Sequence, residues 1–243
     1  MDQSWVPGSL RLTLRDVLEV ALARPFRPYY SDVAEAVIHA AKSHGSRTIV
    51  ELGAGTAPLT QHLAPRQDLP DGLGLVVCDL NPDLGNYDLL ARRYPGRVRA
   101  IREPVDFSKQ LPFSEDSLLV LSATFHHIPL ELRAPVLRQL AHYPAIIAEP
   151  VSRNALSMLF ACMTIFPALL LPPILLGKKP GSLRRFFWCW LLPVAPLLIV
   201  WDGIVSSMRC WDELEWKKAL ATEVNQNHDS LIEVNWLSQS ISW

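Results

Sequence analysis

Residues 48–56 read TIVELGAGT and join a short apolar run to a glycine-containing turn. The run from Thr48 to Leu52 is typical of a buried strand. Glycine at Gly53 and Gly55 removes the side chains that would keep a nucleotide-like ligand away from the backbone. A Gly-x-Gly pair alone is a weak signal. Glu51 sharpens it, because dinucleotide-binding strands usually carry an apolar residue at that place, two positions before the first glycine.

Strands and helices are expected to alternate on both sides of this turn, which predicts an α/β fold with a mostly parallel, doubly wound sheet. Two helices are expected first, at 12–23 and 31–44, packed in front of the sheet. The further expected strands are 75–78, 98–101, 118–121 and 145–148, and the further helices are 58–64, 87–94 and 130–142. An amphipathic helix at 211–224 and a strand at 231–236 follow, and the sequence leaves open whether a final strand completes the sheet.

The composition excludes several classes of function. The 243 residues carry 23 lysines and arginines against 24 aspartates and glutamates, so no net field favours nucleic acid. The four cysteines are scattered without a CxxC pair or a histidine cluster, which predicts neither a disulfide framework nor a metal site. The N-terminus lacks the apolar core of a secretory signal, so we expect a cytoplasmic protein.

Two residues favour another cofactor over a nicotinamide dinucleotide. Pro58 stands where the dehydrogenase fingerprint expects glycine or alanine. Glu51, in the strand that precedes the first glycine, is the second residue that speaks against it.

Three segments resemble class I S-adenosylmethionine-dependent methyltransferases of the small-molecule type. VELGAGTA (50–57) resembles their motif I, VVCDLNP (76–82) resembles the second-strand motif, and residues 97–129, with the connector LPFSEDS, resemble the third and fourth strands. The resemblance extends in order from about residue 31 to residue 150. Ala57 and Leu119 depart from the family pattern, where a third glycine and an aspartate are frequent.

The resemblance implies a Rossmann-like fold and S-adenosylmethionine as the cofactor. Asp79 would bind the ribose hydroxyls, Asp106 and Phe107 would lie against the adenine, and residues 123–127 would form the floor near the methyl group. The cofactor contacts that it implies are Glu51, Gly53, Ala54, Gly55, Thr56, Asp79, Leu80, Asp106, Phe107 and Ala123. Simple caps are the alternative for both aspartates, with Asp79 capping a turn at Asn81.

Methyl transfer to oxygen or nitrogen gains from a general base, and histidine suits that role. His126 and His127 follow the fourth expected strand, at the edge where ligands bind in such sheets. We expect one of them to contact the acceptor; the alternative is a cap on the next helix. Three further residues are substrate candidates: Glu149, Asp202 and Arg209. Pairing of Glu149 with a cation such as Arg153, and a solvated helix end around Asp202, are their alternatives.

An apolar insertion follows the fifth strand. Residues 154–177 carry no charge, and a second apolar stretch, 186–201, follows the basic connector KKPGSLRR. Prolines at 167, 172, 173, 193 and 196 would break hydrogen bonds that hydrocarbon cannot replace, which disfavours two straight membrane spans. A re-entrant or interfacial hairpin fits better, with Lys178, Lys179, Arg184 and Arg185 near anionic head groups and Trp188, Trp190 and Trp201 as anchors. Broken helices that form an apolar lid in a soluble protein are the alternative.

The sequence therefore predicts a methyltransferase acting on a hydrophobic small-molecule or lipid-like acceptor, on oxygen. The expected parts are N-terminal helices (1–46), a cofactor-binding core (47–150), the insertion (151–209) and a C-terminal helix and strand (210–243). Localisation is expected to be cytoplasmic, with peripheral or re-entrant contact at the inner membrane face. A non-catalytic membrane-associated cofactor-binding module and a nucleotide-dependent oxidoreductase are the rival functions.

Overall fold

The computed structural model describes residues 6–23, 27–175, 181–224, 231–234 and 239–242. The chain divides into two compact units. The core unit comprises Pro28–Pro150 and Cys210–Trp243, and the helical unit comprises Met1–Arg27 and Val151–Arg209.

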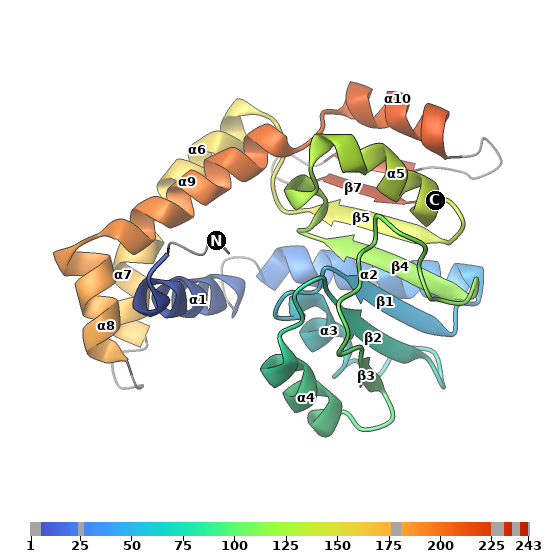
Figure 1. The fold of residues 1–243 in the computed structure, drawn as a ribbon, viewed down its shortest axis with the longest axis horizontal. Coiled ribbons are helices and arrows are strands. Elements are labelled where there is room, and N and C mark those ends of the chain that lie inside the picture. Colours follow the sequence, from blue (N-terminus) through green and yellow to red (C-terminus); the bar gives the residue numbers. More distant parts are fainter. Residues whose placement is uncertain (1–5, 24–26, 176–180, 225–230, 235–238, 243) are drawn as a thin grey trace. The chain divides into compact units, whose positions relative to one another are not determined.

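The core unit is built on one seven-stranded sheet (Figure 1). Its strands are β1 (Thr48–Leu52), β2 (Gly74–Cys78), β3 (Val98–Ala100), β4 (Ser117–Ser122), β5 (Ala145–Glu149), β6 (Leu231–Val234) and β7 (Gln239–Ser242). The order is β3-β2-β1-β4-β5-β7-β6, with β1 to β5 parallel and β7 antiparallel to both of its neighbours. The predicted parallel sheet is confirmed, and the final strand that the sequence left open is present as β7.

The core helices lie where the alternation predicts them. They are α2 (Arg27–His44), α3 (Pro58–Leu63), α4 (Leu84–Arg93), the short 3₁₀ helix η1 (Phe125–His127), α5 (Leu130–Leu140) and α10 (Glu213–Glu223). The buried face of α5 packs with β4, β5 and the fully buried Trp216 of α10 in one apolar core. Because β1, β2, β4 and β5 are parallel, their carboxyl ends meet at one edge, which positions the site.

The helical unit contains α1 (Gly8–Ala23), α6 (Ala155–Met163), α7 (Ile165–Leu175), α8 (Ser182–Phe186), the π-helical turn η2 (Phe187–Leu191) and α9 (Val194–Arg209). The first N-terminal helix, which the sequence analysis expected in front of the sheet, belongs to the helical unit. The apolar side of α1, with Leu10 and Leu14, is buried against Ala168, Cys189 and Ala195 of the insertion. Among the described residues no single helix is long and apolar enough to cross a membrane. The pair Ser182–Leu191 and Val194–Arg209, bent by 69°, meets the length and composition test only when taken together.

The two described basic residues of the connector pair with an acidic residue of α1. Arg185 is 1% exposed and its guanidinium lies 3.0 Å from Asp16 of α1, and Arg184 pairs with the same carboxylate. A buried guanidinium needs such a partner, because an unpaired charge is costly to bury. Lys178 and Lys179 lie outside the described residues.

Candidate functional site

The glycine turn after β1 is held against the loop after β4. Gly53 has a φ of +63°, and a Cβ atom on it would lie 2.4 Å from Thr124 Cγ2 and 3.5 Å from Phe107 Cε1. The Thr124 hydroxyl donates a hydrogen bond to the Gly53 carbonyl at 3.1 Å. Glycine is therefore required here both for the backbone conformation and for the close approach. This contact brings Phe107 and the loop after β4 to the glycine turn, as the resemblance implies.

Asp79 links the ends of β1 and β2. Its Oδ2 accepts from the Gly55 amide and its Oδ1 accepts from the Asn81 amide, each at 2.8 Å. The cap at Asn81 is therefore present, but it occupies only one oxygen. A carboxylate has about four acceptor positions, so two remain for donors such as ribose hydroxyls. Leu80 beside it is 50% exposed and offers an apolar surface at the same strand end.

Glu51 is turned inward rather than toward a ligand. Its Oε2 accepts from the Thr60 amide (2.8 Å) and hydroxyl (2.6 Å), and its Oε1 accepts from the Leu59 amide (3.3 Å). These amides belong to the first turn of α3, where backbone N–H groups lack partners within the helix. Burial raises the pKa of Glu51 to about 7, against the opposing effect of the Thr60 hydrogen bonds. The geometry gives Glu51 a positioning role, fixing α3 behind the glycine turn.

Asp106 caps a turn, which is the alternative that the sequence left open for it. Its Oδ1 accepts from the Ser108 amide (3.0 Å) and hydroxyl (2.6 Å), and its Oδ2 lies 3.3 Å from Lys109 Nζ. The Ser108 hydroxyl and amide and the Lys109 ammonium lower the pKa of Asp106. These contacts shape the loop that presents Phe107.

The other predicted residues at this edge make backbone hydrogen bonds or have a positive φ. Ala54 is buried and its amide donates to the Cys78 carbonyl at 3.0 Å, which ties the turn to β2. The Thr56 carbonyl accepts from the Gln61 side chain at 2.9 Å. Ala57, where the family pattern often has glycine, has a φ of +57°. Ala123 after β4 has a φ of +56°, a second strained non-glycine residue at this edge.

A buried histidine and carboxylate form the chemical centre of the edge. Nδ1 of His126 is hydrogen-bonded to Oε2 of Glu149, and the His126 amide donates to Oε1 of Glu149 at 3.2 Å. Their exposed fractions are 5% and 1%. The carboxylate fixes the tautomer with hydrogen on Nδ1, so Nε2 carries the lone pair. Glu149 thus pairs with His126, not with the cation that the sequence suggested.

The sulfur of Cys210 belongs to the same cluster. One ligand-type atom each of His126, Glu149 and Cys210 lies within 4.8 Å of the others. The chain passes between the two units after Arg27, after Pro150 and after Arg209. These three connections adjoin Tyr29, Glu149 and Cys210.

The side chain of Tyr29 in α2 lies at the carboxyl ends of β4 and β5 and hydrogen-bonds to both strands. Its hydroxyl donates to the Ala148 carbonyl at 2.9 Å and lies 3.1 Å from Ser122 Oγ. A phenol has one proton, so the serine hydroxyl donates to the tyrosine oxygen. Burial and the nearby Glu149 carboxylate raise the pKa of Tyr29 well above its usual value. Tyr29 therefore stays protonated at this edge.

Arg133 of α5 holds the turn that carries His126. It is fully buried, and its side chain donates to the carbonyls of Ile128 (3.1 Å) and His126 (3.4 Å). Its guanidinium carbon lies 5.3 Å from the ring centroids of both Phe125 and Trp211. Because its hydrogen bond to His126 goes to the backbone carbonyl, Arg133 is a positioning residue.

The last three predicted residues are His127, Asp202 and Arg209. His127 is exposed, although its ring centroid lies 4.1 Å from that of His126. Asp202 and Arg209 belong to α9 of the helical unit, whereas Glu149 belongs to the core unit.

Sequence reasoning missed Tyr29, Ser122, Arg133 and Cys210, and it included Thr124 only as part of the expected floor at 123–127. Ser122 stands beside that floor, which was its only signal. Tyr29, Arg133 and Cys210 are distant from any motif.

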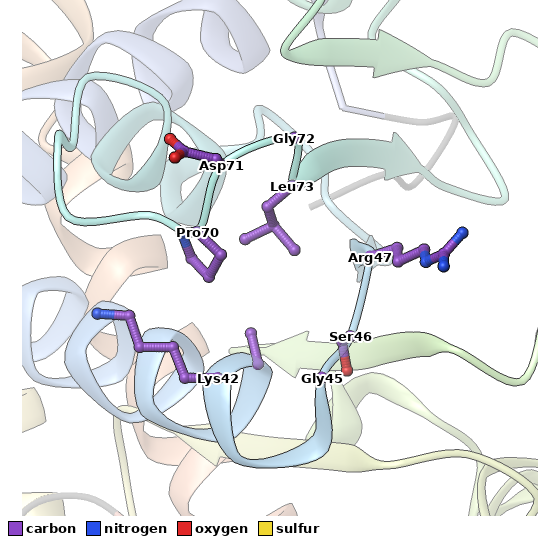
Figure 2. Close-up of a pocket in the computed structure, with 9 residues that line it drawn as sticks. Lys42, Gly45, Ser46, Arg47, Pro70, Asp71, Gly72 and Leu73 are labelled. Carbon is purple, nitrogen blue, oxygen red and sulfur yellow. The ribbon is translucent and has the colours of Figure 1, made fainter.

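One cavity of the core unit lies away from this edge. Its volume of about 520 Å³ would admit a small ligand, and it is lined by Ala41, Lys42 and residues 45–47 and 70–73. These residues end α2 and precede β1 and β2, so the cavity lies at the amino edge of the sheet. In Figure 2 the charged ends of Lys42, Arg47 and Asp71 point away from its middle. It offers no group suited to the chemistry of the carboxyl edge.

The fold is that of class I S-adenosylmethionine-dependent methyltransferases, which confirms the fold predicted from the sequence. An O-methyltransferase family protein from Burkholderia thailandensis is similar with a TM-score of 0.58 and 12% identity, over 94% of this chain and 58% of that one. Mitomycin 7-O-methyltransferase MmcR is similar with a TM-score of 0.50 and 15% identity, over 92% and 53%. The methyltransferase domain of bacterial CtHen1 has a TM-score of 0.51 and 11% identity, over 86% and 95%.

This chain therefore spans just over half the length of the first two proteins. Neither a protein-family model nor a curated protein sequence matches it.

Proposed function

We propose that this protein is an S-adenosylmethionine-dependent methyltransferase that methylates an oxygen of a small apolar acceptor, with His126 as the general base. The observation that carries the proposal is the buried His126–Glu149 pair, which lies at the same sheet edge as the glycine turn and Asp79. The fold and the resemblance of three segments support the choice of cofactor.

The residues of the edge fit this cofactor. Gly53 leaves the backbone open, Asp79 keeps acceptor positions, and the half-exposed Leu80 and the nearby Phe107 offer apolar contacts. S-adenosylmethionine, when bound, supplies an electrophilic methyl group on a sulfonium sulfur.

The chain's own residues then have separate tasks. Nε2 of His126 accepts the proton of the acceptor hydroxyl, and the Glu149 carboxylate stabilises the imidazolium that forms. Arg133 and Tyr29 hold the backbone around this pair, and the proton leaves to solvent after transfer. The apolar surroundings, with Phe125 and Trp211, favour an acceptor with an apolar body.

Calorimetric titration with S-adenosylmethionine and its demethylated product tests the cofactor. We expect micromolar binding, weakened about 10- to 100-fold in Asp79→Ala through loss of hydrogen bonds to a charged group. Asp71→Ala, an exposed aspartate at the opposite edge of the sheet, is the matched control and should bind as wild type. Binding of neither compound, with binding of a nicotinamide dinucleotide instead, would replace the proposal with the oxidoreductase function.

The burial of His126 also suits a non-catalytic cofactor-binding module, in which the pair is only structural. Methyl transfer from labelled cofactor to a panel of hydroxylated apolar compounds separates the two functions. Cofactor binding without transfer to any member of the panel, or to an apolar cell extract, would favour the non-catalytic module.

A further inference from the structure

The helical unit leaves large apolar side chains uncovered. Phe160, Met163, Phe166, Leu170, Leu197 and Trp201 are between 46% and 65% exposed. We call these six residues the apolar face. They come from α6, α7 and α9, three helices that contact one another, and exposed apolar side chains gathered on neighbouring elements mark interaction sites.

Helix α7 has no polar side. Residues 165–175 read IFPALLLPPIL, with no polar or charged residue. Ala168 is buried inside the unit, whereas Phe166 and Leu170 on the same helix are exposed. A helix that is apolar all round belongs in a large core or in a membrane. Within residues 165–170 the described part of the unit therefore covers Ala168 and leaves Phe166 and Leu170 uncovered.

Side chains of the helical unit donate hydrogen bonds to backbone carbonyls near the breaks in its helices. Pro173 cannot donate to the Leu169 carbonyl four residues earlier, and the Trp190 indole N–H donates to that carbonyl at 2.7 Å. At the junction of α6 and α7 the Thr164 hydroxyl donates to the Ala161 carbonyl at 2.6 Å. Such replacement is needed where no water can reach the backbone. The prolines were expected to leave backbone groups without hydrogen bonds, but the carbonyl that Pro173 cannot pair has a donor in Trp190.

The contact between α6 and α9 is of the kind found between helices in lipid. A Cβ atom on Gly203 would lie 3.0 Å from Ala161 Cβ, so the two helices approach closely there. The buried Ser157 and Ser207 hydroxyls lie 3.2 Å apart across the same contact. Small residues and serine hydrogen bonds hold helices together where an apolar environment supplies no hydrophobic drive. Figure 1 shows α6 and α9 running side by side.

We propose that the apolar face docks into a lipid bilayer, at the boundary between head groups and acyl chains. The 69° bend between Ser182–Leu191 and Val194–Arg209 suits a segment that lies in the interface. Asp16 neutralises part of the charge of Arg184 and Arg185, so apolar contact, not the described arginines, drives the binding. This surface goes beyond the proposed reaction and does not depend on it.

Co-sedimentation of the full chain with vesicles tests the proposal. One set is pure phosphatidylcholine and the other contains phosphatidylglycerol as well. We expect partition into both sets. The pair Leu197→Ser and Trp201→Ser on α9 should weaken it at least about tenfold, the loss expected when buried apolar area is removed. The pair Phe160→Ser and Met163→Ser on α6 should do the same, which guards against a folding defect in one helix.

The matched control is the pair Leu89→Ser and Leu214→Ser in the core unit. These leucines are 65% and 76% exposed and lie outside the apolar face, so their loss should leave partition unchanged. S-adenosylmethionine affinity, measured on every variant, reports that the core unit is intact. Absence of partition into both vesicle types would overturn the proposal. Equal loss in the control pair would also overturn it, as would dissociation of a wild-type oligomer by the α9 pair without any vesicle binding.

Discussion

Nδ1 of His126 is hydrogen-bonded to Oε2 of Glu149, a residue 23 positions away, and both side chains are almost completely buried. The neighbouring His127 is exposed. Two adjacent histidines therefore differ in environment, and one of them has the geometry of a base held by a carboxylate.

His126→Gln should lower kcat of methyl transfer by about 10²- to 10⁴-fold, the range that a positioned acid or base contributes. His127→Gln is the neighbouring comparison and should retain most activity. Initial rates at saturating cofactor, with cofactor affinity measured in parallel, check the prediction. Equal losses in the two variants, or none in His126→Gln, would remove His126 from the mechanism.

Gly53→Ala should destabilise the core more than Gly72→Ala. Both glycines have positive φ, at +63° and +76°, so both substitutions carry a backbone cost of about 1–2 kcal/mol. Only at Gly53 does the added Cβ meet a side chain, Thr124 Cγ2 at 2.4 Å, whereas nothing lies within 4 Å at Gly72. Overpacking adds about 1–3 kcal/mol. Urea unfolding of the two variants measures the difference, and equal midpoints would contradict the close approach.

Ala57→Gly should stabilise the protein by about 0.5–1 kcal/mol. Ala57 has a φ of +57°, a conformation that glycine adopts without steric cost. Ala54 lies in the same turn and is not among the positive-φ residues, so Ala54→Gly should destabilise instead. Thermal unfolding of both variants gives the two signs, and a lower Tm for Ala57→Gly would show that the strain is absent.

The pH dependence of stability should carry a contribution from Glu51. Burial raises its pKa from 4.5 to about 7 in the folded chain. The folded state therefore keeps a proton that the unfolded state releases above pH 4.5. The resulting stability is present below pH 4.5 and is lost as the pH rises to about 7, at about 1.4 kcal/mol per pH unit.

Urea unfolding at pH 5, 6, 7 and 8 checks this dependence against Glu51→Gln, which cannot ionise. The free energy of unfolding of the wild type, relative to the variant, should fall by up to about 3 kcal/mol between pH 4.5 and 7 and then level off. A difference that does not change with pH would mean that Glu51 ionises at its ordinary pKa.

The sheet could be predicted because buried parallel strands are short apolar runs separated by helices. The run at 48–52 and the observed β1 coincide, and the others agree within one or two residues. The location of α1 could not be predicted, because an amphipathic helix shows that it has a buried face but not what covers it. Leu10 and Leu14 find their contacts in residues more than 150 positions later.

The candidate site was predictable only in part. The glycine turn and Asp79 follow from strand ends that meet at one edge. The sequence could not distinguish Asp79, which keeps acceptor positions, from Glu51 and Asp106, which bind Thr60 and Ser108. All three are carboxylates near strand ends, and their difference lies in local hydrogen bonds.

The helical unit interrupts the core unit between β5 and α10, and this affects the formation of the sheet. Strand β7 pairs with β5, yet residues 151–209 separate the end of β5 from the segment that leads to β7. Closing a flexible loop of that length costs about 4 kcal/mol of chain entropy. Glu149 and Cys210 lie together at its two ends, so the ordered insertion holds these ends close to each other and lowers the chain entropy that is lost when β7 pairs with β5. Removal of the insertion would therefore require a short linker between Pro150 and Cys210 for the seven-stranded sheet to form.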